Sequence, residues 1–450
     1  MRASTASARP EARERSEQTV LIKADTMQTK TSLARTPCLR PLPTGLRTSY
    51  ATWLLPLLLL TPPSALQAQF TYTTNNGAIT ITGYAGTNPA VTIPETLKGL
   101  PVTSIGDNAF YDCSSLASVT IDKNVTSIGD SAFGCCFSLT NVTIGTNVTS
   151  IGDEAFSSCS SLAAITIPSS VTSIGDNAFV GCFSLTAITV DARSFFYSDV
   201  GGVLFDKSQS ALVQYPAGKI GGYTIPDTVI SIGAYAFYNC INLTDVSIGP
   251  NMIIIGAWAF STCTGLTNVT IGSNVTTIGD HAFDSCGSLA AITIPDSVTS
   301  IGDGAFADCP SLTTITLDPR NSFYSEVDGV LFGQSQTLLV AYPAGKVGAY
   351  TIPDTVTSIG DYAFAICTGL TSVKIGTNVT SIGEMAFVGC TSLTSVTIGN
   401  GVTIIGDQMF QDCTSLTSFT IGNGVTSIGG WAFWHCLHLP SDSVRDSAPD

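Results

Sequence analysis

Charged residues are scarce in this 450-residue chain: Asp, Glu, Lys and Arg together make up 11 %, and there are only three histidines. Half of the basic residues, nine of eighteen, lie within the first 48 positions. From Phe70 onward the chain has nine basic and twenty-nine acidic residues, a net charge of −20. A surface of this sign repels phosphate groups, so nucleic acid is excluded as an expected partner.

Catalytic signatures are missing as well. None of the histidines, His281, His435 and His438, belongs to a recognisable Ser-His-Asp set, and there is no phosphate-binding loop or Cys-x-x-Cys pair. The calcium-binding repeat Gly-Gly-x-Gly-x-Asp is also absent. We therefore predict that the protein is not an enzyme and holds no metal or cofactor.

Long apolar runs are limited to one segment, Trp53–Leu60, which follows the basic head and precedes Ser64–Ala68. This order is typical of a secretory signal peptide with cleavage after Ala68, and the run is too short to span a membrane. We predict a basic leader at 1–49, the signal region at 50–68, and a mature chain that is secreted or displayed on the cell surface without an integral span. Met1 and Met27 both remain candidates for the true start.

The rest of the chain repeats one pattern twelve times with a period of 23 residues. The pattern is Ile-Gly-Asp-x-Ala-Phe-x-x-Cys-x-x-Leu-Thr-x-Val-Thr-Ile. Its phenylalanines are Phe110, Phe133, Phe156, Phe179, Phe237, Phe260, Phe283, Phe306, Phe364, Phe387, Phe410 and Phe433. A fixed period of this length predicts a solenoid, in which stacked coils bury a core that no single coil can cover.

Each repeat contains a strand pattern followed by a turn. Val142 and Ile144 alternate with Asn141 and Thr143, so the first pair should face inward and the second outward. Because the alternation recurs in register, we predict one long parallel sheet built from 23-residue coils. The repeated glycine, for example Gly152, indicates a backbone conformation that only glycine adopts easily. The Asp that usually follows it is predicted to cap a short helical turn.

The repeated cysteine allows two interpretations. Export would normally oxidise cysteines to disulfides, and stacked neighbours would lie within bridging distance. Their side chains would nevertheless all point the same way, in one apolar column. We therefore predict buried, unpaired cysteines that act as small hydrophobic residues.

Two insertions, residues 191–225 and 318–352, interrupt the period and are near copies 127 residues apart. The first contains Val203–Phe205, a polar turn and Ala211–Tyr215, which predicts a β-hairpin. The larger unit is therefore four ordinary coils plus one longer coil. The chain leaves this pattern after the last repeat, and residues 441–450 are predicted to form a short tail.

The insertions concentrate aromatic and basic residues. Tyr and Arg together are typical of interface hot spots, although aromatic residues also fill the core of a wider coil. The candidate partner-binding residues are Arg193, Phe196, Tyr197, Lys207, Tyr215, Lys219, Arg320, Phe323, Tyr324, Tyr342 and Lys346.

Several segments resemble the BspA-type leucine-rich-repeat surface proteins, known mainly from bacteria. The resemblance rests on Val125–Phe133, Ile294–Val298, Cys309–Leu312, Ile79–Tyr84 and Gly99–Ile105, and it extends from about Phe70 to Leu439. It implies a leucine-rich-repeat solenoid over residues 70–440, export, and a role in adhesion or protein binding. It implies no catalytic residue.

The sequence thus favours an exported, non-catalytic solenoid that binds a protein or a cell-surface or matrix partner. The candidate contacts are the two insertions and the Thr, Asn and Ser side chains of the sheet face. Two alternatives stay open: a structural protein whose solenoids associate end to end, and binding of glycans or ice by the ladders of Thr side chains.

Overall fold

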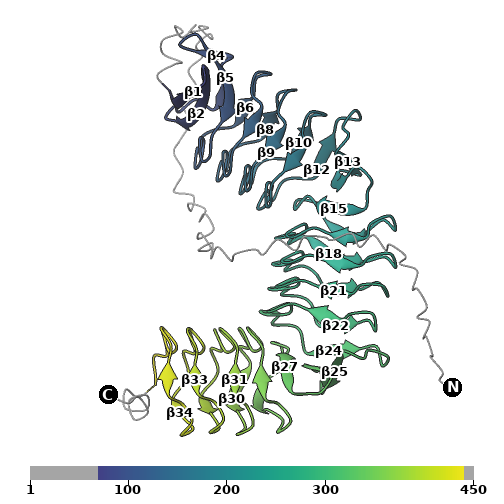
Figure 1. Cartoon of the computed structure of the whole chain (residues 1–450), viewed down its shortest axis with the longest axis vertical. Coiled ribbons are helices and arrows are strands. Elements are labelled where there is room, and N and C mark those ends of the chain that lie inside the picture. The colour runs from purple at the N-terminus through teal and green to yellow at the C-terminus, as the bar shows by residue number, and fades with distance from the viewer. Residues whose placement is uncertain (1–68, 440–450) are drawn as a thin grey trace, which may run out of the picture. The chain divides into compact units, whose positions relative to one another are not determined.

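The computed structural model describes residues 69–439, and the predicted leader (1–49), signal region (50–68) and tail (441–450) lie outside them. The described chain winds into a solenoid of about fifteen coils, most of them 23 residues long (Figure 1). The predicted fold class is confirmed in all but one detail. Instead of the expected short helical turns, the described residues contain strands and non-helical turns.

Each coil places one strand on a sheet face and, in most coils, a shorter strand on the return side. The sheet-face strands are β3 (Ala90–Thr92), β6 (Ser118–Thr120), β8 (Asn141–Thr143), β10 (Ala164–Ile167), β12 (Ala187–Val190), β16 (Gly221–Thr224), β18 (Leu243–Ser247), β20 (Asn268–Thr270), β22 (Ala291–Ile294), β24 (Thr314–Leu317), β28 (Gly348–Thr351), β30 (Leu370–Lys374), β32 (Ser395–Thr397) and β34 (Ser418–Thr420). They hydrogen-bond in consecutive parallel sheets of two to four strands.

The return side contains mostly two-residue strands. These are β5 (Leu100–Ile105), β7 (Ser127–Ile128), β9 (Ser150–Ile151), β11 (Ser173–Ile174), β17 (Ser231–Ile232), β19 (Ile254–Ile255), β21 (Thr277–Ile278), β23 (Ser300–Ile301), β29 (Ser358–Ile359), β31 (Ser381–Ile382), β33 (Ile404–Ile405) and β35 (Ser427–Ile428), with β4 (Thr96–Leu97) paired to β5. Ser pairs with Ser and Ile with Ile in successive coils, as in β9 and β11, so the 23-residue period sets the register.

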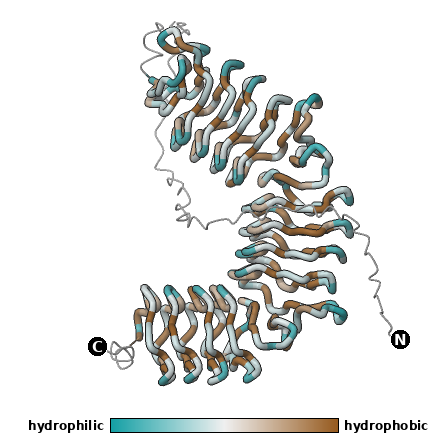
Figure 2. Tube along the Cα trace, viewed as in Figure 1, coloured by the Kyte–Doolittle hydropathy of each residue, from teal (hydrophilic) through white to brown (hydrophobic). Residues whose placement is uncertain are grey.

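The predicted inward and outward positions are confirmed. Val142 and Ile144 are buried, whereas Asn141 and Thr143 are exposed. Figure 2 shows the same order throughout, with hydrophobic positions recurring at equivalent places in successive coils. Burial of each large side chain stabilises the fold by roughly 1.5–3 kcal/mol, and most of these side chains are covered by the neighbouring coils.

The repeated phenylalanines stack on one another in three separate columns. We call the coils of Phe110–Phe179 the first stack, those of Phe237–Phe306 the second and those of Phe364–Phe433 the third. Within the second stack, ring centroids lie 4.6 to 5.9 Å apart. Such parallel, closely spaced rings pack the interior densely.

The turn that carries each phenylalanine is not helical because two of its residues have left-handed backbone conformations. In the third coil these are Glu154 (φ 54°) and Ser158 (φ 58°). An α-helix needs uniformly negative φ and bonds from each N–H to the fourth carbonyl before it. Here the N–H groups of Glu154, Phe156 and Ser158 donate instead to carbonyls of the next coil, at 2.6 to 2.9 Å.

The repeated Asp bonds to the next coil, so its predicted role as a helix cap is wrong. One carboxylate oxygen of Asp130 accepts a hydrogen bond from the backbone N–H of Asp153 at 2.9 Å, and Asp153 does the same for Asp176. Gly152 is required by this close approach and not by a special φ. A Cβ at Gly152 would lie only 2.6 Å from the carbonyl carbon of Gly129.

The twelve repeat cysteines are unpaired, as predicted, and ten of them are buried. Each buried thiol faces a carbonyl in the preceding coil. The Sγ of Cys159, for instance, lies 3.2 Å from the carbonyl oxygen of Phe133. Burial raises the pKa of Cys136 and Cys159 well above the ordinary thiol value, so these side chains remain protonated, unreactive donors.

Hairpins begin the solenoid and separate its three stacks. Their strands are β1 (Phe70–Asn75), β2 (Ala78–Tyr84), β13 (Tyr197–Val200), β14 (Val203–Asp206), β15 (Ala211–Gln214), β25 (Tyr324–Val327), β26 (Val330–Gly333) and β27 (Leu338–Ala341). The predicted pairing of Val203–Phe205 with the segment after the polar turn is confirmed by β14 and β15. An additional strand, β13, pairs with the other edge of β14.

Candidate protein-binding surface of the hairpin inserts

Each insert has an inner part that joins two stacks. Leu204 of β14 belongs to the core of the first stack, whereas its neighbours Val203 and Phe205 belong to that of the second. In the second insert, Leu331 belongs in the same way to the core of the second stack, whereas Val330 and Phe332 belong to that of the third. Successive side chains of a strand point to opposite faces, so one hairpin strand packs against the cores of both adjacent stacks and closes the junction between them.

Two of the candidate aromatic residues belong to these interiors. Tyr215 and Tyr342 are buried, and each ring stacks on the first phenylalanine of the following stack, at 4.8 Å from Phe237 and 4.9 Å from Phe364. Burial raises the pKa of Tyr342 to about 12 and that of Tyr215 further. Both residues therefore begin a ring column, and neither offers a contact to a partner.

Tyr197 and Tyr324 connect each insert to the preceding coil. The Tyr197 hydroxyl accepts a hydrogen bond from the backbone N–H of Ile174 at 3.0 Å, and Tyr324 does the same for Ile301 at 2.9 Å. Burial raises the pKa of both phenols. These two candidates are half-buried structural residues.

The two arginines are exposed, but their charge is matched within the insert. Arg193 donates from Nε and Nη2 to the two carboxylate oxygens of Asp191, at 3.0 and 2.6 Å. Its guanidinium lowers the pKa of Asp191 to about 2. Arg320 makes the same pair with Asp318 and lies 3.4 Å from Asp296. The arginines are therefore exposed but add little net charge to the surface.

The lysines differ among themselves. Lys207 is exposed in the turn between β14 and β15. Lys219 donates to the carbonyl of Gly201 at 3.0 Å, and Lys346 to that of Asp328 at 2.7 Å. The ammonium group of Lys219 thus holds the turn before β14, and that of Lys346 holds the turn before β26. The residues that follow these lysines, Ile220 and Val347, remain at the surface.

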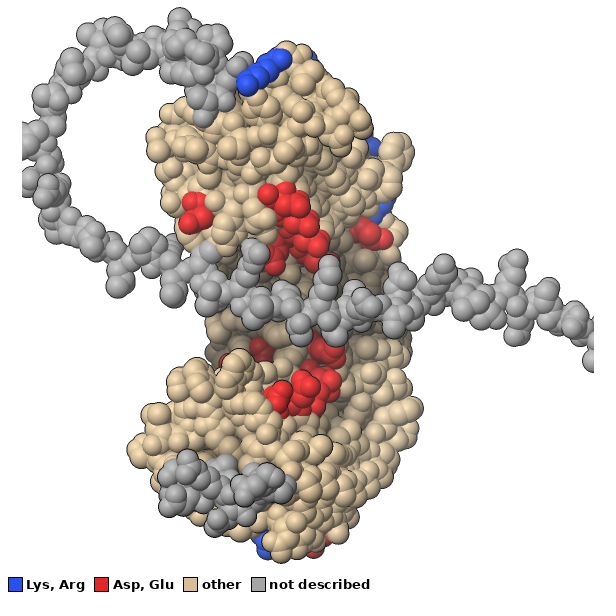
Figure 3. Space-filling model, turned by 60° about the vertical axis from the view of Figure 1, so that its left-hand side comes forward, with Lys and Arg blue, Asp and Glu red and all other residues tan. Residues whose placement is uncertain are grey.

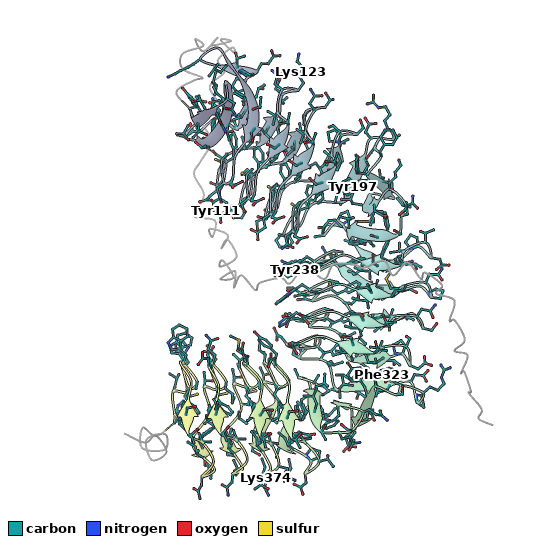
Figure 4. All side chains as sticks on the ribbon, viewed as in Figure 1. Tyr111, Lys123, Tyr197, Tyr238, Phe323 and Lys374 are labelled. Atoms are coloured by element: carbon teal, nitrogen blue, oxygen red, sulfur yellow. The ribbon has the colours of Figure 1, made fainter. Side chains whose placement is uncertain are left out.

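The exposed apolar residues of the inserts form two groups. The first contains Phe196 and Phe323, each about half exposed, together with Phe195, which is 83 % exposed. Phe323 is labelled in Figure 4, where the side chains of the second insert project from the ribbon. We call these residues with Arg193 and Arg320 the strand-start patches, because they precede β13 and β25.

The second group was not expected from the sequence. Ile220 and Val347 are 80 % and 81 % exposed. Val200 and Val327 end β13 and β25, next to the turns that Lys219 and Lys346 hold, and are partly exposed. We call these residues and the two lysines the turn patches. One sequence feature could have predicted this exposure. Both inserts place a large aliphatic residue between Lys and Gly, in Lys219-Ile-Gly221 and Lys346-Val-Gly348.

The rest of the described surface is mainly acidic and hydroxyl-rich, with exposed apolar residues in ordinary coils such as Ile230, Ile253 and Ile404. On the face shown in Figure 3, Asp and Glu gather in clusters while Lys and Arg are few. Within residues 69–439 no group of three His, Cys, Asp or Glu side chains is placed to hold a metal ion. No helix in the described part of the chain is long and apolar enough to cross a membrane.

Many Thr side chains of the two surface ladders hydrogen-bond to a neighbouring coil. On the return side, Thr126, Thr149 and Thr172 each donate to a carbonyl of the preceding coil at 3.0 to 3.1 Å. On the sheet face, the hydroxyls of Thr166 and Thr189 bond to each other at 2.9 Å. These contacts stabilise the stacking of coils.

Comparison with protein families assigns the chain. The description "BspA type Leucine rich repeat region" matches residues 88–209, 215–337 and 342–447, most of the chain, in six copies. The three matched segments correspond closely to the three stacks. The protein therefore belongs to the BspA-type leucine-rich-repeat family, as the sequence resemblance predicted. The members of this family are typically bacterial proteins that are secreted or held on the cell surface.

Two bacterial proteins of known structure are similar to this chain. A leucine-rich cell surface protein from Faecalibacterium prausnitzii is 29 % identical, with 85 % of this chain and 96 % of that chain covered and a TM-score of 0.44. A leucine-rich repeat protein from Bacteroides ovatus is 26 % identical, with coverage of 82 % and 80 % and a TM-score of 0.37. No curated protein matches the chain.

Proposed function

We propose that the protein is an exported, non-catalytic adhesion protein that binds a protein partner through the exposed parts of its two inserts. The observation that carries this proposal is the recurrence of a strand-start patch and a turn patch in both inserts. Family membership supports a role in protein binding or adhesion.

The chemistry of the patches fits a protein surface. Exposed Phe and Arg side chains on short loops supply large apolar area with a planar polar group beside it, and such residues are enriched at interface hot spots. The Asp partners of Arg193 and Arg320 keep the patches nearly neutral, so the partner is bound mainly by apolar contact and shape. The stacks between the inserts act as a rigid support.

Adhesion of the full chain tests the proposal. Beads coated with the protein are counted on cells and on matrix proteins from the organism's surroundings. The test variant replaces the exposed apolar residues by Ser at Phe195, Phe196, Ile220, Phe323 and Val347. Because each hot spot contributes 2 kcal/mol or more, retention should fall by at least about tenfold.

The matched control is Lys374→Thr. It replaces an exposed sheet-face lysine by threonine, the residue found at the paired position, Thr397, in the next coil. It should adhere like the parent protein. Undiminished adhesion of the insert variant, with loss in the sheet-face variant, would place the contact on the sheet face and overturn the proposal. Export is checked separately by N-terminal sequencing of protein recovered outside the cell, with Gln69 expected as the first residue.

A further inference from the structure

The turns that carry the repeated Phe form a surface of a single charge. We call the twelve segments that run from the repeated Gly to the residue after the repeated Cys, for example Gly256–Thr264, the acidic face. They contain fourteen of the twenty-nine acidic residues that follow Phe70 and none of the nine basic ones. A surface of this sign attracts a cationic ligand and repels an anionic one.

An aromatic ladder interrupts the acidic residues in the second stack. The residue two positions before the repeated Phe, which we call the ladder position, is Tyr235, Trp258 and His281 in its first three coils. The rings of Tyr235 and Trp258 lie parallel at 6.1 Å, and those of Trp258 and His281 at 4.0 Å. Tyr362, in the first coil of the third stack, meets His281 edge-on at 4.9 Å. Tyr238, labelled in Figure 4, packs on the edge of Tyr235 at 5.7 Å.

The backbone at the ladder position is left-handed, which is costly for a large side chain. The angle φ is 59° at Tyr235, 57° at Trp258 and 55° at Tyr362. Gly and Asn adopt this conformation most easily, and Asn occupies the position at Asn108. Bulky residues held in such conformations cluster at functional sites. Because the turn itself would be better served by a small residue, this placement indicates a use for the rings themselves.

Polar groups at both ends of the ladder lack a partner. The bonds between successive Asp side chains stop at the last coils of the first and second stacks, so the exposed carboxylates of Asp176 and Asp303 accept no hydrogen bond from the described residues. Two buried side-chain atoms of the described chain are also unsatisfied, and both are at ladder positions: Asn177 Oδ1 and His281 Nδ1. Asp284 lies 3.8 Å from that nitrogen, beyond hydrogen-bond distance. Since each of these atoms can act as an acceptor, all four groups can bind a donor.

The carboxylates crowd together where the ladder reaches the third stack. Gly304 makes room for the His281 ring, since a Cβ there would lie 2.5 Å from Cε1 of that ring. Burial, with Asp361 and Asp280 nearby, raises the pKa of Asp303. A cation bound at this place would stabilise the ionised carboxylates.

We propose that the acidic face binds a basic peptide segment of a partner protein, with Lys or Arg side chains over the aromatic ladder. Ammonium and guanidinium groups are attracted to the faces of Trp and Tyr rings, and they donate strong hydrogen bonds to carboxylates. A metal ion fits less well, because no group of three His, Cys, Asp or Glu side chains in residues 69–439 is placed to hold one. An extended peptide that follows the ladder can place cations at both ends of it.

Charge and processing separate this partner from the chain's own remaining segments. Residues 441–450 contain three Asp and one Arg, so the tail does not complement an acidic face. The head is basic, but it belongs to the leader that we expect to be removed with the signal region. The proposal therefore applies to the exported form and rests on the export proposed above, although not on adhesion by the inserts.

The experiment measures the binding of a ten-residue peptide of alternating Arg and Ser by titration calorimetry at low salt. The full chain and the chain lacking residues 1–68 are both titrated. A peptide of alternating Glu and Ser and the polyamine spermine serve as controls. We expect the Arg peptide to bind both forms of the chain more tightly than either control does, with an affinity that falls as salt is added.

The test variant combines Tyr235→Asn with Trp258→Asn, because Asn suits the left-handed backbone and removes both rings. The dissociation constant of the Arg peptide should rise at least about tenfold. Met385→Asn is the matched control, since it makes the same change at a ladder position without a ring and should bind like the parent. If a thermal melt shows that the test variant is unfolded, Asp176→Asn with Asp303→Asn replaces it. This variant removes two exposed charges and no hydrogen bond, and the constant should rise about fivefold.

Phe323→Ala separates this inference from the proposed adhesion, since it changes only an insert and should bind the Arg peptide like the parent. The inference is overturned if the Arg peptide does not bind the chain lacking residues 1–68, or if it binds both variants as tightly as the parent. Equal affinity for the Glu peptide or for spermine would also contradict it. Binding to the shortened chain but not to the full chain would assign the acidic face to the chain's own leader in place of a partner.

Discussion

The ordinary coils and the two inserts use the same kinds of residue in opposite ways. In an ordinary coil the aromatic Phe points inward and stacks on its copy in the next coil, as Phe260 does on Phe283 at 5.2 Å. In the inserts the aromatic residues divide among core, junction and surface: Tyr342 is buried, Tyr324 bonds to the preceding coil, and Phe323 faces solvent. An exposed apolar patch therefore arises where the repeat is interrupted and its stacking partners are missing.

The largest expected difference between the two regions is the effect of removing one phenyl ring. Phe283→Ala leaves a cavity in the middle of the second ring column and should lower the free energy of unfolding by about 3–5 kcal/mol. Phe323→Ala removes a half-exposed ring and should change it by no more than about 0.5 kcal/mol. Urea unfolding and limited proteolysis of the two variants measure this contrast. Equal losses would contradict the inward and outward assignments.

The junction tyrosines should show an intermediate effect. Tyr324→Phe keeps the ring but leaves the N–H of Ile301 without its acceptor, which should lower the free energy of unfolding by about 1–2 kcal/mol. Tyr342→Phe is the matched variant, since burial and the nearby Cys367 and Cys390 raise the pKa of Tyr342 with no hydrogen bond contributing, and it should be nearly neutral. The comparison is made by urea unfolding; a larger loss for Tyr342→Phe would reverse the assigned roles.

Much of this division could not be read from the sequence, although the coil itself could. The alternation of Val142 and Ile144 with polar residues correctly predicts which side chains are buried, because it depends on strand geometry alone. Tyr197 and Tyr215 look equivalent in the sequence, since both are aromatic residues near basic ones. Their roles depend on the positions of Ile174 and Phe237, which neighbouring coils supply.

The turn that carries Phe was mispredicted for a related reason. Gly-Asp-x-Ala-Phe resembles a helix start when one coil is considered alone, because Asp before a short apolar segment is a common cap. In the solenoid the carboxylate of Asp130 instead accepts a hydrogen bond from the backbone N–H of Asp153, 23 positions later. Left-handed residues such as Ser158 turn the N–H groups toward the next coil, and no local pattern announces them, since the position accepts Ser, Asp, Thr and Ile alike.

The Asp ladder offers a smaller test of how coils hold one another. Asp153→Ala removes the acceptor for the N–H of Asp176 and should lower the free energy of unfolding by about 1 kcal/mol. Asp153→Asn retains a carbonyl oxygen at this place and should recover most of the loss. Urea unfolding distinguishes the two variants. Because Ala234 occupies this position naturally, neither should prevent folding; a fully unfolded Asp153→Ala protein would point to a role beyond this bond.

The smallest expected effect contrasts an acidic residue of a coil with one of an insert by the pH dependence of stability. Burial, with Asp284 nearby, raises the pKa of Asp308 above its ordinary value, while a hydrogen bond from Ser285 opposes the shift. Its ionised form is thus less favourable in the folded chain, and the penalty disappears as the pH falls through the raised pKa to the unfolded value. Asp308→Asn should therefore raise the melting temperature slightly at neutral pH and lose this advantage below about pH 4.

For Asp191, whose folded pKa of about 2 lies below the unfolded value, the sign reverses. Asp191→Asn should slightly lower the melting temperature at neutral pH, and the deficit should vanish as the pH falls toward about 2. Because Asp191 is exposed, solvent and salt weaken its pair with Arg193, and added salt should remove the Asp191 effect before that of Asp308.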